Sequence, residues 1–186
     1  MSNLHIIFGP MFAGKSTYLI NTIQSLLDNN ISNEEILIIN HFSDNRYSDK
    51  SEICTHDNKK MSSISLNNLG ELFNNINNNI DIDKKKYIFI DEGQFFSDLY
   101  DCVKLLLIKY KKTIYIGGLD GDYKQESFST SRLFDLIPYA TTVTKLTSIC
   151  VECNEIAPFT KRIIQNGEQI LVGGSDSYKP VCLNHL

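Results

Sequence analysis

Short apolar runs recur along the chain, separated by polar or glycine-containing segments. They predict buried β-strands at Leu4–Phe8, Ile36–Ile39, Tyr87–Ile90, Thr113–Gly117 and Thr142–Leu146. Between these runs, apolar residues recur three or four positions apart, which predicts helices over Lys15–Asp28, Asn67–Ile80 and Asp98–Tyr110. The alternation favours a parallel sheet with helices on both faces, and such sheets bind ligands at the carboxyl ends of their strands.

The pattern changes after about Thr147, where cysteines occur in pairs and glycine and proline interrupt short apolar runs. We therefore expect two parts, an α/β domain over residues 1–146 and a small lobe over residues 147–186. Composition adds little to this division. A hydrophobic fraction of 42% in 186 residues is enough for a core of ordinary size.

The segment that follows the first predicted strand matches the phosphate-binding pattern G-x-x-x-x-G-K-[ST] without a mismatch. It consists of Gly9, Pro10, Met11, Phe12, Ala13, Gly14, Lys15 and Ser16. Glycines let several backbone N–H groups point at one anion, and the helix that follows adds its positive N-terminal dipole. Lys15 is expected to reach the outer phosphates of ATP, and the Ser16 hydroxyl to bind Mg²⁺.

Two acids, Asp91 and Glu92, end the predicted strand Tyr87–Ile90. An acid in this place commonly holds Mg²⁺ next to a P-loop, and we assign that role to Asp91. Glu92 has two readings. A carboxylate beside the metal site either orients water for ATP hydrolysis or accepts the proton of a substrate hydroxyl in a kinase.

The C-terminal part contains two ligand pairs, Cys150 with Cys153 and Cys182 with His185. This spacing is typical of a closed Cys₃His zinc site, and redox chemistry at one pair is the alternative. A structural zinc would fasten a lobe too small to be held by apolar burial. The expected fold is therefore α/β, a P-loop NTPase (RecA-like) parallel sheet flanked by helices, with a small C-terminal zinc-binding lobe.

Charge and hydropathy limit the partners. Eighteen basic and 22 acidic residues give a net charge of −4, without the basic stripe that is typical of nucleic-acid binders. No apolar run approaches the roughly 20 residues that span a bilayer, and no secretory signal is visible. We expect a cytoplasmic protein that binds neither nucleic acid nor membrane. In a reducing compartment, its five cysteines are metal ligands or free thiols.

Taken together, these motifs resemble one family, the zinc-containing (type II) thymidine kinases of cells and large DNA viruses. The resemblance runs in order along the whole chain. It is carried by residues 9–17, 44–48, 54–57, 90–96, 118–121, 145–147, 160–162 and 172–174, followed by Asp176 and Tyr178.

The resemblance implies a reaction in which the γ-phosphate of ATP passes to the 5′-hydroxyl of thymidine, giving dTMP and ADP. Glu92 would be the general base. Asp91 and Ser16 would serve Mg²⁺, with Asp44 assisting, and Arg46 would steady phosphate. Thr17 would complete the nucleotide site. The family also implies a homotetramer and feedback inhibition by dTTP.

The resemblance further implies a set of residues around thymidine: Met11, Gln94, Phe95, Leu119, Phe128, Thr160, Leu171, Val172, Gly173, Gly174 and Tyr178. Thr160 would lie near the thymine methyl group, and the segment between the two zinc pairs would close over the nucleoside. The sequence departs from the commoner family pattern at His185, where many relatives have cysteine. It also departs from that pattern after the turn Leu119–Gly121, at Asp122, Tyr123, Lys124 and Ser127.

Two other classes of function share some of these features. A P-loop ATPase that remodels nucleic acid would use the same Gly9–Ser16, Asp91 and Glu92, but it fits poorly with the acidic charge and the short chain. A zinc ribbon that only contacts other proteins would leave the P-loop unexplained.

Overall fold

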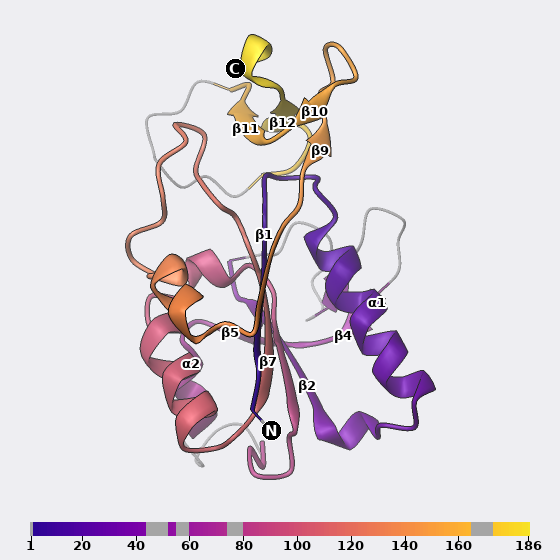
Figure 1. Ribbon diagram of the computed structural model, residues 1–186, viewed down its shortest axis with the longest axis vertical. Coiled ribbons are helices and arrows are strands. Elements are labelled where there is room, and N and C mark those ends of the chain that lie inside the picture. Colours follow the sequence, from indigo (N-terminus) through magenta and orange to yellow (C-terminus); the bar gives the residue numbers. More distant parts are fainter. Residues whose placement is uncertain (1, 44–51, 55–59, 74–79, 165–172) are drawn as a thin grey trace.

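The computed structural model of the chain describes residues 2–43, 52–54, 60–73, 80–164 and 173–186. Its main element is a six-stranded, wholly parallel sheet with the strand order β5-β2-β6-β7-β1-β8. The strands are β1 Leu4–Phe8, β2 Ile36–His41, β5 Ile64–Leu66, β6 Tyr87–Ile90, β7 Thr113–Gly118 and β8 Thr142–Lys145. The predicted α/β fold is confirmed (Figure 1).

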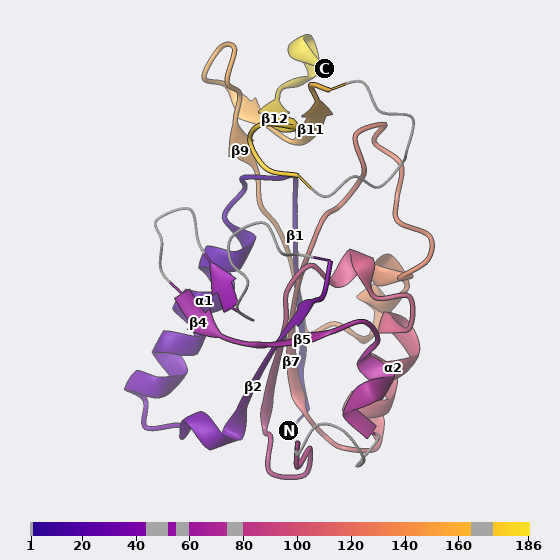
Figure 2. The ribbon, with the colours of Figure 1, turned by 180° about the vertical axis from the view of Figure 1, so that it is seen from behind.

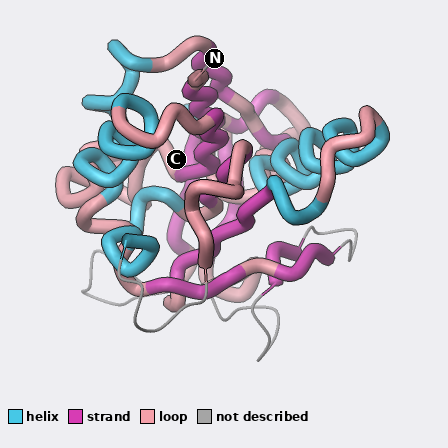
Figure 3. The backbone as a smooth tube through the Cα atoms, turned by 90° about the horizontal axis from the view of Figure 1, so that it is seen from below, coloured by secondary structure: helices cyan, strands magenta, loops and turns pink. Residues whose placement is uncertain are grey.

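Helices lie on both sides of the sheet (Figure 3). The two α-helices are α1, Lys15–Asp28, and α2, Leu99–Ile108, and they flank the sheet from opposite sides. Shorter 3₁₀ helices occupy Asn33–Glu35, Leu69–Phe73, Gly93–Phe95, Leu133–Tyr139 and Leu183–His185. Within the described ranges, no helix has both the length and the apolar character needed to cross a membrane.

The alternation of side chains along β1 explains how both faces become core. Ile7 packs with Leu19 of α1 in one buried cluster, whereas Ile6 belongs to a larger cluster with Val103 and Leu106 of α2. All five side chains are at most 1% exposed. β1 therefore needs apolar residues on both sides, as expected for an inner strand of a parallel sheet.

The helix predicted over Asn67–Ile80 is replaced, in its described part, by the 3₁₀ helix Leu69–Phe73; residues 74–79 lie outside the described range. Asparagine and glycine are weak helix formers, so the apolar spacing alone does not decide the outcome. In addition, the Asp98 carboxylate accepts the backbone N–H groups of Leu69 at 3.1 Å and Gly70 at 2.7 Å. This tertiary contact fixes the tight turn.

Two short features are absent from the sequence prediction. β5 adds a sixth strand at the sheet edge, but with only three residues it gives no clear apolar pattern. A small antiparallel pair joins β3, Glu52–Cys54, to β4, Lys60–Ser62. Cys54 is the last residue of β3.

The remaining strands form two antiparallel pairs near the C-terminus. They are β9 Ser148–Ile149 with β10 Ile156–Ala157, and β11 Phe159–Arg162 with β12 Tyr178–Val181. These C-terminal strands (β9–β12) lie beyond the end of the sheet toward which β1 runs (Figures 1 and 2). They consequently stand over the carboxyl ends of the parallel strands, where ligands of such sheets bind.

Candidate active site

The P-loop leaves β1 at Gly9 and enters α1 at Lys15. Gly9 is required by close approach, because a Cβ there would lie 2.4 Å from the carbonyl oxygen of Leu146, just after β8. Gly14 precedes the helix with φ 82°, a left-handed conformation that suits glycine. Pro10, Phe12 and Ala13 complete the loop, and Thr17 lies in the first turn of α1. The predicted strand–loop–helix context is present.

The Lys15 ammonium group folds over this loop. Its Nζ donates hydrogen bonds to the carbonyl oxygens of Gly9 at 3.1 Å and Pro10 at 2.7 Å, and the residue is 8% exposed. These two hydrogen bonds hold the Lys15 ammonium group against the P-loop. A phosphate group bound there would be a stronger acceptor for it than a carbonyl.

Ser16 and Asp91 meet although they come from different elements. The Ser16 hydroxyl donates a hydrogen bond of 2.6 Å to Asp91 Oδ2, and Asp91 Oδ1 accepts the backbone N–H of Glu92 at 3.0 Å. Gly117 in β7 leaves room for this carboxylate, since a Cβ there would lie 2.9 Å from Asp91 Oδ1. A hydroxyl and a carboxylate side by side suit Mg²⁺, which prefers oxygen ligands.

Glu92 lies next to this pair in an unusual conformation. Its φ of 52° and ψ of 40° are left-handed, which costs a residue other than glycine about 1–3 kcal/mol. The side chain is only 8% exposed, and Gln94 Nε2 donates a hydrogen bond of 2.5 Å to its Oε2. Gln94 Oε1 in turn accepts the backbone N–H of Leu119 at 2.9 Å. The Glu92 carboxylate is thus aimed by a buried amide tied to the end of β7.

Aromatic side chains gather beside these acids. Phe95 meets Phe128 edge to face, with ring centroids 6.4 Å apart and an interplanar angle of 79°. His41, at the end of β2, lies 5.7 Å from Phe95 on the same measure. The loop that carries Phe128 begins at Leu119, whose backbone N–H is hydrogen-bonded to Gln94, the partner of the Glu92 carboxylate. The structure therefore brings together Phe95 and Phe128, two of the residues that the family resemblance places around a flat base.

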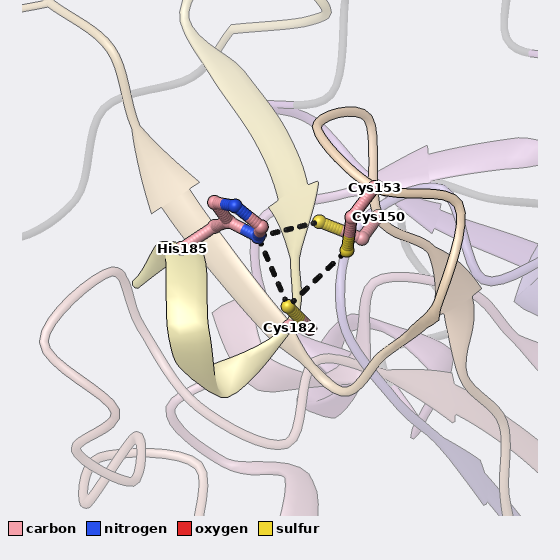
Figure 4. A group of neighbouring side chains, drawn as sticks. All are labelled: Cys150, Cys153, Cys182 and His185. Carbon is pink, nitrogen blue, oxygen red and sulfur yellow. Dashed lines mark hydrogen bonds between the residues drawn. The ribbon is translucent and has the colours of Figure 1, made fainter.

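The two predicted ligand pairs converge into one cluster formed by Cys150, Cys153, Cys182 and His185 (Figure 4). Their four ligand atoms all lie within 4.8 Å of one another. The Cys153 and Cys182 sulfurs are 3.6 Å apart, and His185 Nδ1 is 3.2 Å from the Cys182 sulfur.

These separations fit a tetrahedral zinc. Zn–S bonds of about 2.3 Å place two sulfurs about 3.8 Å apart, close to the observed 3.6 Å between Cys153 and Cys182. Burial would raise the pKa of the Cys150 thiol, but hydrogen bonds from the backbone of Cys182, Glu152 and Cys153 outweigh it and lower the pKa to about 6. The Cys150 thiolate, the form that binds zinc, is therefore favoured at neutral pH. At Cys153 the hydrogen bond from the Glu155 backbone is outweighed by burial and by the hydrogen bonds to Cys182 and Cys150, which raise the pKa of that thiol to about 11. The cluster can hold a zinc ion with four protein ligands.

Comparisons with known proteins agree with this geometry. A sequence model of the family described as thymidine kinase matches residues 2–186. The chain belongs to the thymidine kinase family. A thymidine kinase of Oryza sativa subsp. japonica is 38% identical over 182 residues, which is 98% of this chain and 65% of the rice protein. A thymidine kinase of fowlpox virus is 37% identical, over 97% of this chain and 94% of the viral one. A cytosolic thymidine kinase of Bos taurus is 34% identical, over 96% and 69%.

In this thymidine kinase family member, two predicted substrate residues belong to the C-terminal strands. Thr160 in β11 is 5% exposed, and its Oγ1 accepts the backbone N–H of Met11 at 2.9 Å. Tyr178 begins β12, and its hydroxyl accepts a hydrogen bond of 2.8 Å from Arg162 Nη2. Gly173 is required by close approach, because a Cβ there would lie 2.5 Å from Ser177 Oγ.

Sequence reasoning gave no role to Arg162 or Tyr123. The Arg162 guanidinium carbon lies 3.9 Å from the centre of the Tyr123 ring and 5.3 Å from that of Tyr178. The arginine thus joins the loop after β7 to β11 and β12. Its only signals in the sequence are the 160–162 motif and the unusual residue at 123, and neither indicates that the two meet.

Four predicted site residues, Asp44, Arg46, Leu171 and Val172, lie outside the described residues. Their roles remain predictions from the family resemblance. The described part of the site therefore consists of the P-loop, the Asp91–Glu92 pair, the aromatic side chains and the C-terminal strands.

Proposed function

We propose that this protein transfers the γ-phosphate of ATP to the 5′-hydroxyl of thymidine, giving dTMP and ADP, with Glu92 as the general base. The observation that carries the proposal is the position of Glu92, one residue from the carboxylate bonded to Ser16 of the P-loop. A base and a phosphate cradle must converge in this way for a single phosphoryl transfer. Family membership and the names of the relatives supply the substrate.

In the proposed step, the thymidine 5′-oxygen forms a bond to the γ-phosphorus while the bond between that phosphorus and the β–γ bridging oxygen breaks. The hydroxyl proton passes to the Glu92 carboxylate, and ADP leaves. The hydrogen bond from Gln94 holds the carboxylate in one orientation. Low exposure of Glu92 keeps competing water away from the carboxylate.

Lys15 and the P-loop amides would hold the phosphates, and Ser16 with Asp91 would hold Mg²⁺, which neutralises charge that develops on the transferred group. Phe95 and Phe128 would enclose the flat base. Met11, Leu119, Thr160, Gly173, Gly174 and Tyr178 complete the proposed thymidine site, with Leu171 and Val172 closing it and Asp44 and Arg46 assisting at the phosphates.

The cluster of Cys150, Cys153, Cys182 and His185 would hold a structural zinc, because four protein ligands leave no open position. We further propose, on the family resemblance, that the protein is a homotetramer inhibited by dTTP. Residues 147–186 would form the substrate-covering lobe beside a nucleotide-binding domain of residues 1–146.

Glu92→Gln tests the proposal. The amide keeps the size of the side chain but cannot accept the proton, so we expect kcat to fall about 10²–10⁴-fold while ATP affinity stays near that of the wild type. The measurement is dTMP formation from ATP and thymidine with Mg²⁺, together with calorimetric ATP binding. Glu34→Gln is the matched control, because Glu34 is exposed and precedes the amino end of β2, whereas Glu92 follows the carboxyl end of the parallel neighbour β6.

Two results would contradict the proposal. Wild-type protein that binds ATP but forms no dTMP would exclude thymidine phosphorylation. ATP hydrolysis stimulated by nucleic acid, without phosphate reaching thymidine, would favour a P-loop ATPase. If Glu92→Gln kept near full activity, the reaction would stand but another group would have to be the base.

A further inference from the structure

Two consecutive residues of the P-loop are hydrogen-bonded to the C-terminal strands. The backbone N–H of Met11 donates to Thr160 Oγ1 at 2.9 Å, and the carbonyl oxygen of Phe12 accepts a hydrogen bond of 3.1 Å from Ser148 Oγ. Thr160 lies in β11 and Ser148 in β9. One loop is therefore held from two strands that belong to different antiparallel pairs.

The loop needs such support at this point. Phe12 has φ 64°, a left-handed conformation that is unfavourable for a residue with a Cβ. Backbone of this kind persists where the surroundings over-determine it. Met11 and Thr160 are 8% and 5% exposed, so the bond between them is shielded from water and hard to replace by hydration. The two hydroxyls thus hold the loop at Met11 and Phe12, shortly before Gly14 and Lys15.

Both supporting strands lead directly to the Cys/His cluster. Ser148 is two residues before Cys150, and its partner in the β9–β10 pair is Ala157. Thr160 pairs with Pro180, two residues before Cys182. Each hydroxyl is therefore close to a ligand of the cluster, Ser148 along its own strand and Thr160 across a strand pair.

We infer that Ser148 and Thr160 are positioning residues for the phosphate donor, through which the C-terminal strands set the shape of the ATP cradle. The inference rests on the proposed function, since it takes the P-loop to be the ATP site. It adds that these strands act on ATP as well as on thymidine. Thr160, which the family resemblance places near the thymine methyl group, would then serve both substrates, since its hydroxyl is bonded to the P-loop.

Two substitutions of Thr160 separate these roles. Thr160→Val keeps the shape and removes the hydroxyl, so we expect ATP affinity to fall about tenfold, in line with the loss of one shielded hydrogen bond. Thr160→Ser keeps the hydroxyl and removes the methyl group. ATP affinity should then stay within about twofold of the wild type, while the preference for thymidine over deoxyuridine falls.

Ser148→Ala provides an independent test, because it removes the other hydroxyl without touching the proposed thymidine site. We expect about a fivefold loss of ATP affinity with unchanged thymidine affinity. Thr147→Val is the matched control, since Thr147 is the exposed neighbour of Ser148 and should bind ATP as the wild type does. ATP binding is measured by calorimetry on the full chain without thymidine, and zinc content shows that the cluster is intact.

Wild-type ATP affinity in both Thr160→Val and Ser148→Ala, with one zinc per chain, would overturn the inference. If Thr160→Val does not fold, Ser148→Ala decides alone, since wild-type ATP affinity in that variant overturns the inference and selective loss supports it. Parallel assays of dTMP formation separate this result from the proposed function. Weakened ATP binding in the variants of a protein that forms no dTMP supports the positioning role and contradicts the kinase reaction.

Discussion

The parallel sheet and the C-terminal strands are stabilised in different ways. The sheet has apolar side chains on both faces: Leu4, Ile6 and Ile88 are fully buried in the larger cluster, and Ile7 and Phe89 are at most 1% exposed in the cluster on the other face. The C-terminal strands have a buried cluster of four small or medium side chains, two of them cysteines of the Cys/His cluster, with Phe159 packed against it. Their strands have only two to four residues each.

This difference shows where each part obtains its stability. Apolar burial suffices for the sheet, whereas a part with so small a core usually needs a metal or disulfides. The proposed site draws on both, because the P-loop leaves the sheet and is hydrogen-bonded to the C-terminal strands. Changes to either part should therefore reach the active site by separate routes.

The largest effect is expected from Cys182→Ser. This removes the sulfur that lies 3.2 Å from His185 Nδ1 and 3.6 Å from the Cys153 sulfur, so zinc should be lost and the C-terminal strands should open while the sheet stays folded. We expect dTMP formation to fall at least about 100-fold. Metal analysis and hydrogen exchange of β9–β12 against β1, β6 and β7 are the measurements.

The matched control is His185→Cys, which keeps four zinc ligands and should keep one zinc per chain. If the amides of β9–β12 stayed fully protected from hydrogen exchange in metal-free Cys182→Ser, these strands would need no metal, and their stability would not differ in origin from that of the sheet.

The next effect concerns the sheet alone. Leu106→Ala opens a cavity beside α2, where Leu106 is fully buried, and should lower the free energy of unfolding by about 2–5 kcal/mol. Leu105→Ala, at a neighbouring position that is 36% exposed, should change it by about 0.5 kcal/mol or less. Urea unfolding followed by circular dichroism gives both values. If Leu106→Ala lost zinc at urea concentrations below its unfolding transition, the stability of the C-terminal strands would depend on that of the sheet.

A smaller effect should follow at Arg162, which links the loop after β7 to β11 and β12. Arg162→Lys keeps the charge but loses the flat guanidinium group that lies over Tyr123. We expect thymidine affinity to fall about 3–30-fold, the range of a cation–π contact. Tyr123→Phe keeps a ring under the guanidinium group and should bind nearly normally. Equal losses in both variants would point to the tyrosine hydroxyl instead.

The smallest expected effect concerns the chemical reactivity of the Cys102 thiol. Burial, with the negative charge of Asp98 beside it, raises the pKa of the Cys102 thiol to about 12. Because the pKa is raised, the group stays protonated and unreactive toward iodoacetamide at pH 7–9, and it ionises only as the pH approaches 12. Mass spectrometry should find Cys102 unlabelled in the folded protein and labelled in urea. A chelator should expose the cluster thiols but leave Cys102 unchanged, and rapid native labelling of Cys102 would contradict this.

The sequence predicts elements best where a long apolar pattern and a motif coincide. The bounds of β1, α1 and β6 agree with the expected Leu4–Phe8, Lys15–Asp28 and Tyr87–Ile90. The turn at Leu69–Phe73 was mispredicted because it depends on the carboxylate of Asp98, about 28 residues away, which no local pattern reveals.

In the site, the motifs predict both the Ser16–Asp91 contact and the Cys/His cluster. Ligands of one metal ion must lie close together, so residue types and their spacing are enough for this prediction. The sequence does not reveal that Gly117 and Gly118 leave room for neighbouring site side chains. A Cβ on Gly118 would lie 3.2 Å from Gln94 Oε1, but only the folded chain shows which side chain needs that room. The contact of Arg162 with Tyr123 is equally a product of topology.

The place of β1 in the sheet has a consequence for how the chain is made. Within the described part of the chain, β1 pairs with β7 and β8, and its hydrogen bonds with Thr141 and Thr142 join residues 137 positions apart in the sequence. During translation this apolar strand is therefore synthesised long before β7 and β8. By contrast, β2 and β6 are closer in the sequence and can pair earlier in synthesis. Until β7 and β8 arrive, Leu4–Phe8 is exposed to chaperones and to other nascent chains. We therefore expect the pairing of β1 with β7 and β8, which completes the strand that leads into the P-loop, to be the slow and chaperone-sensitive stage of folding.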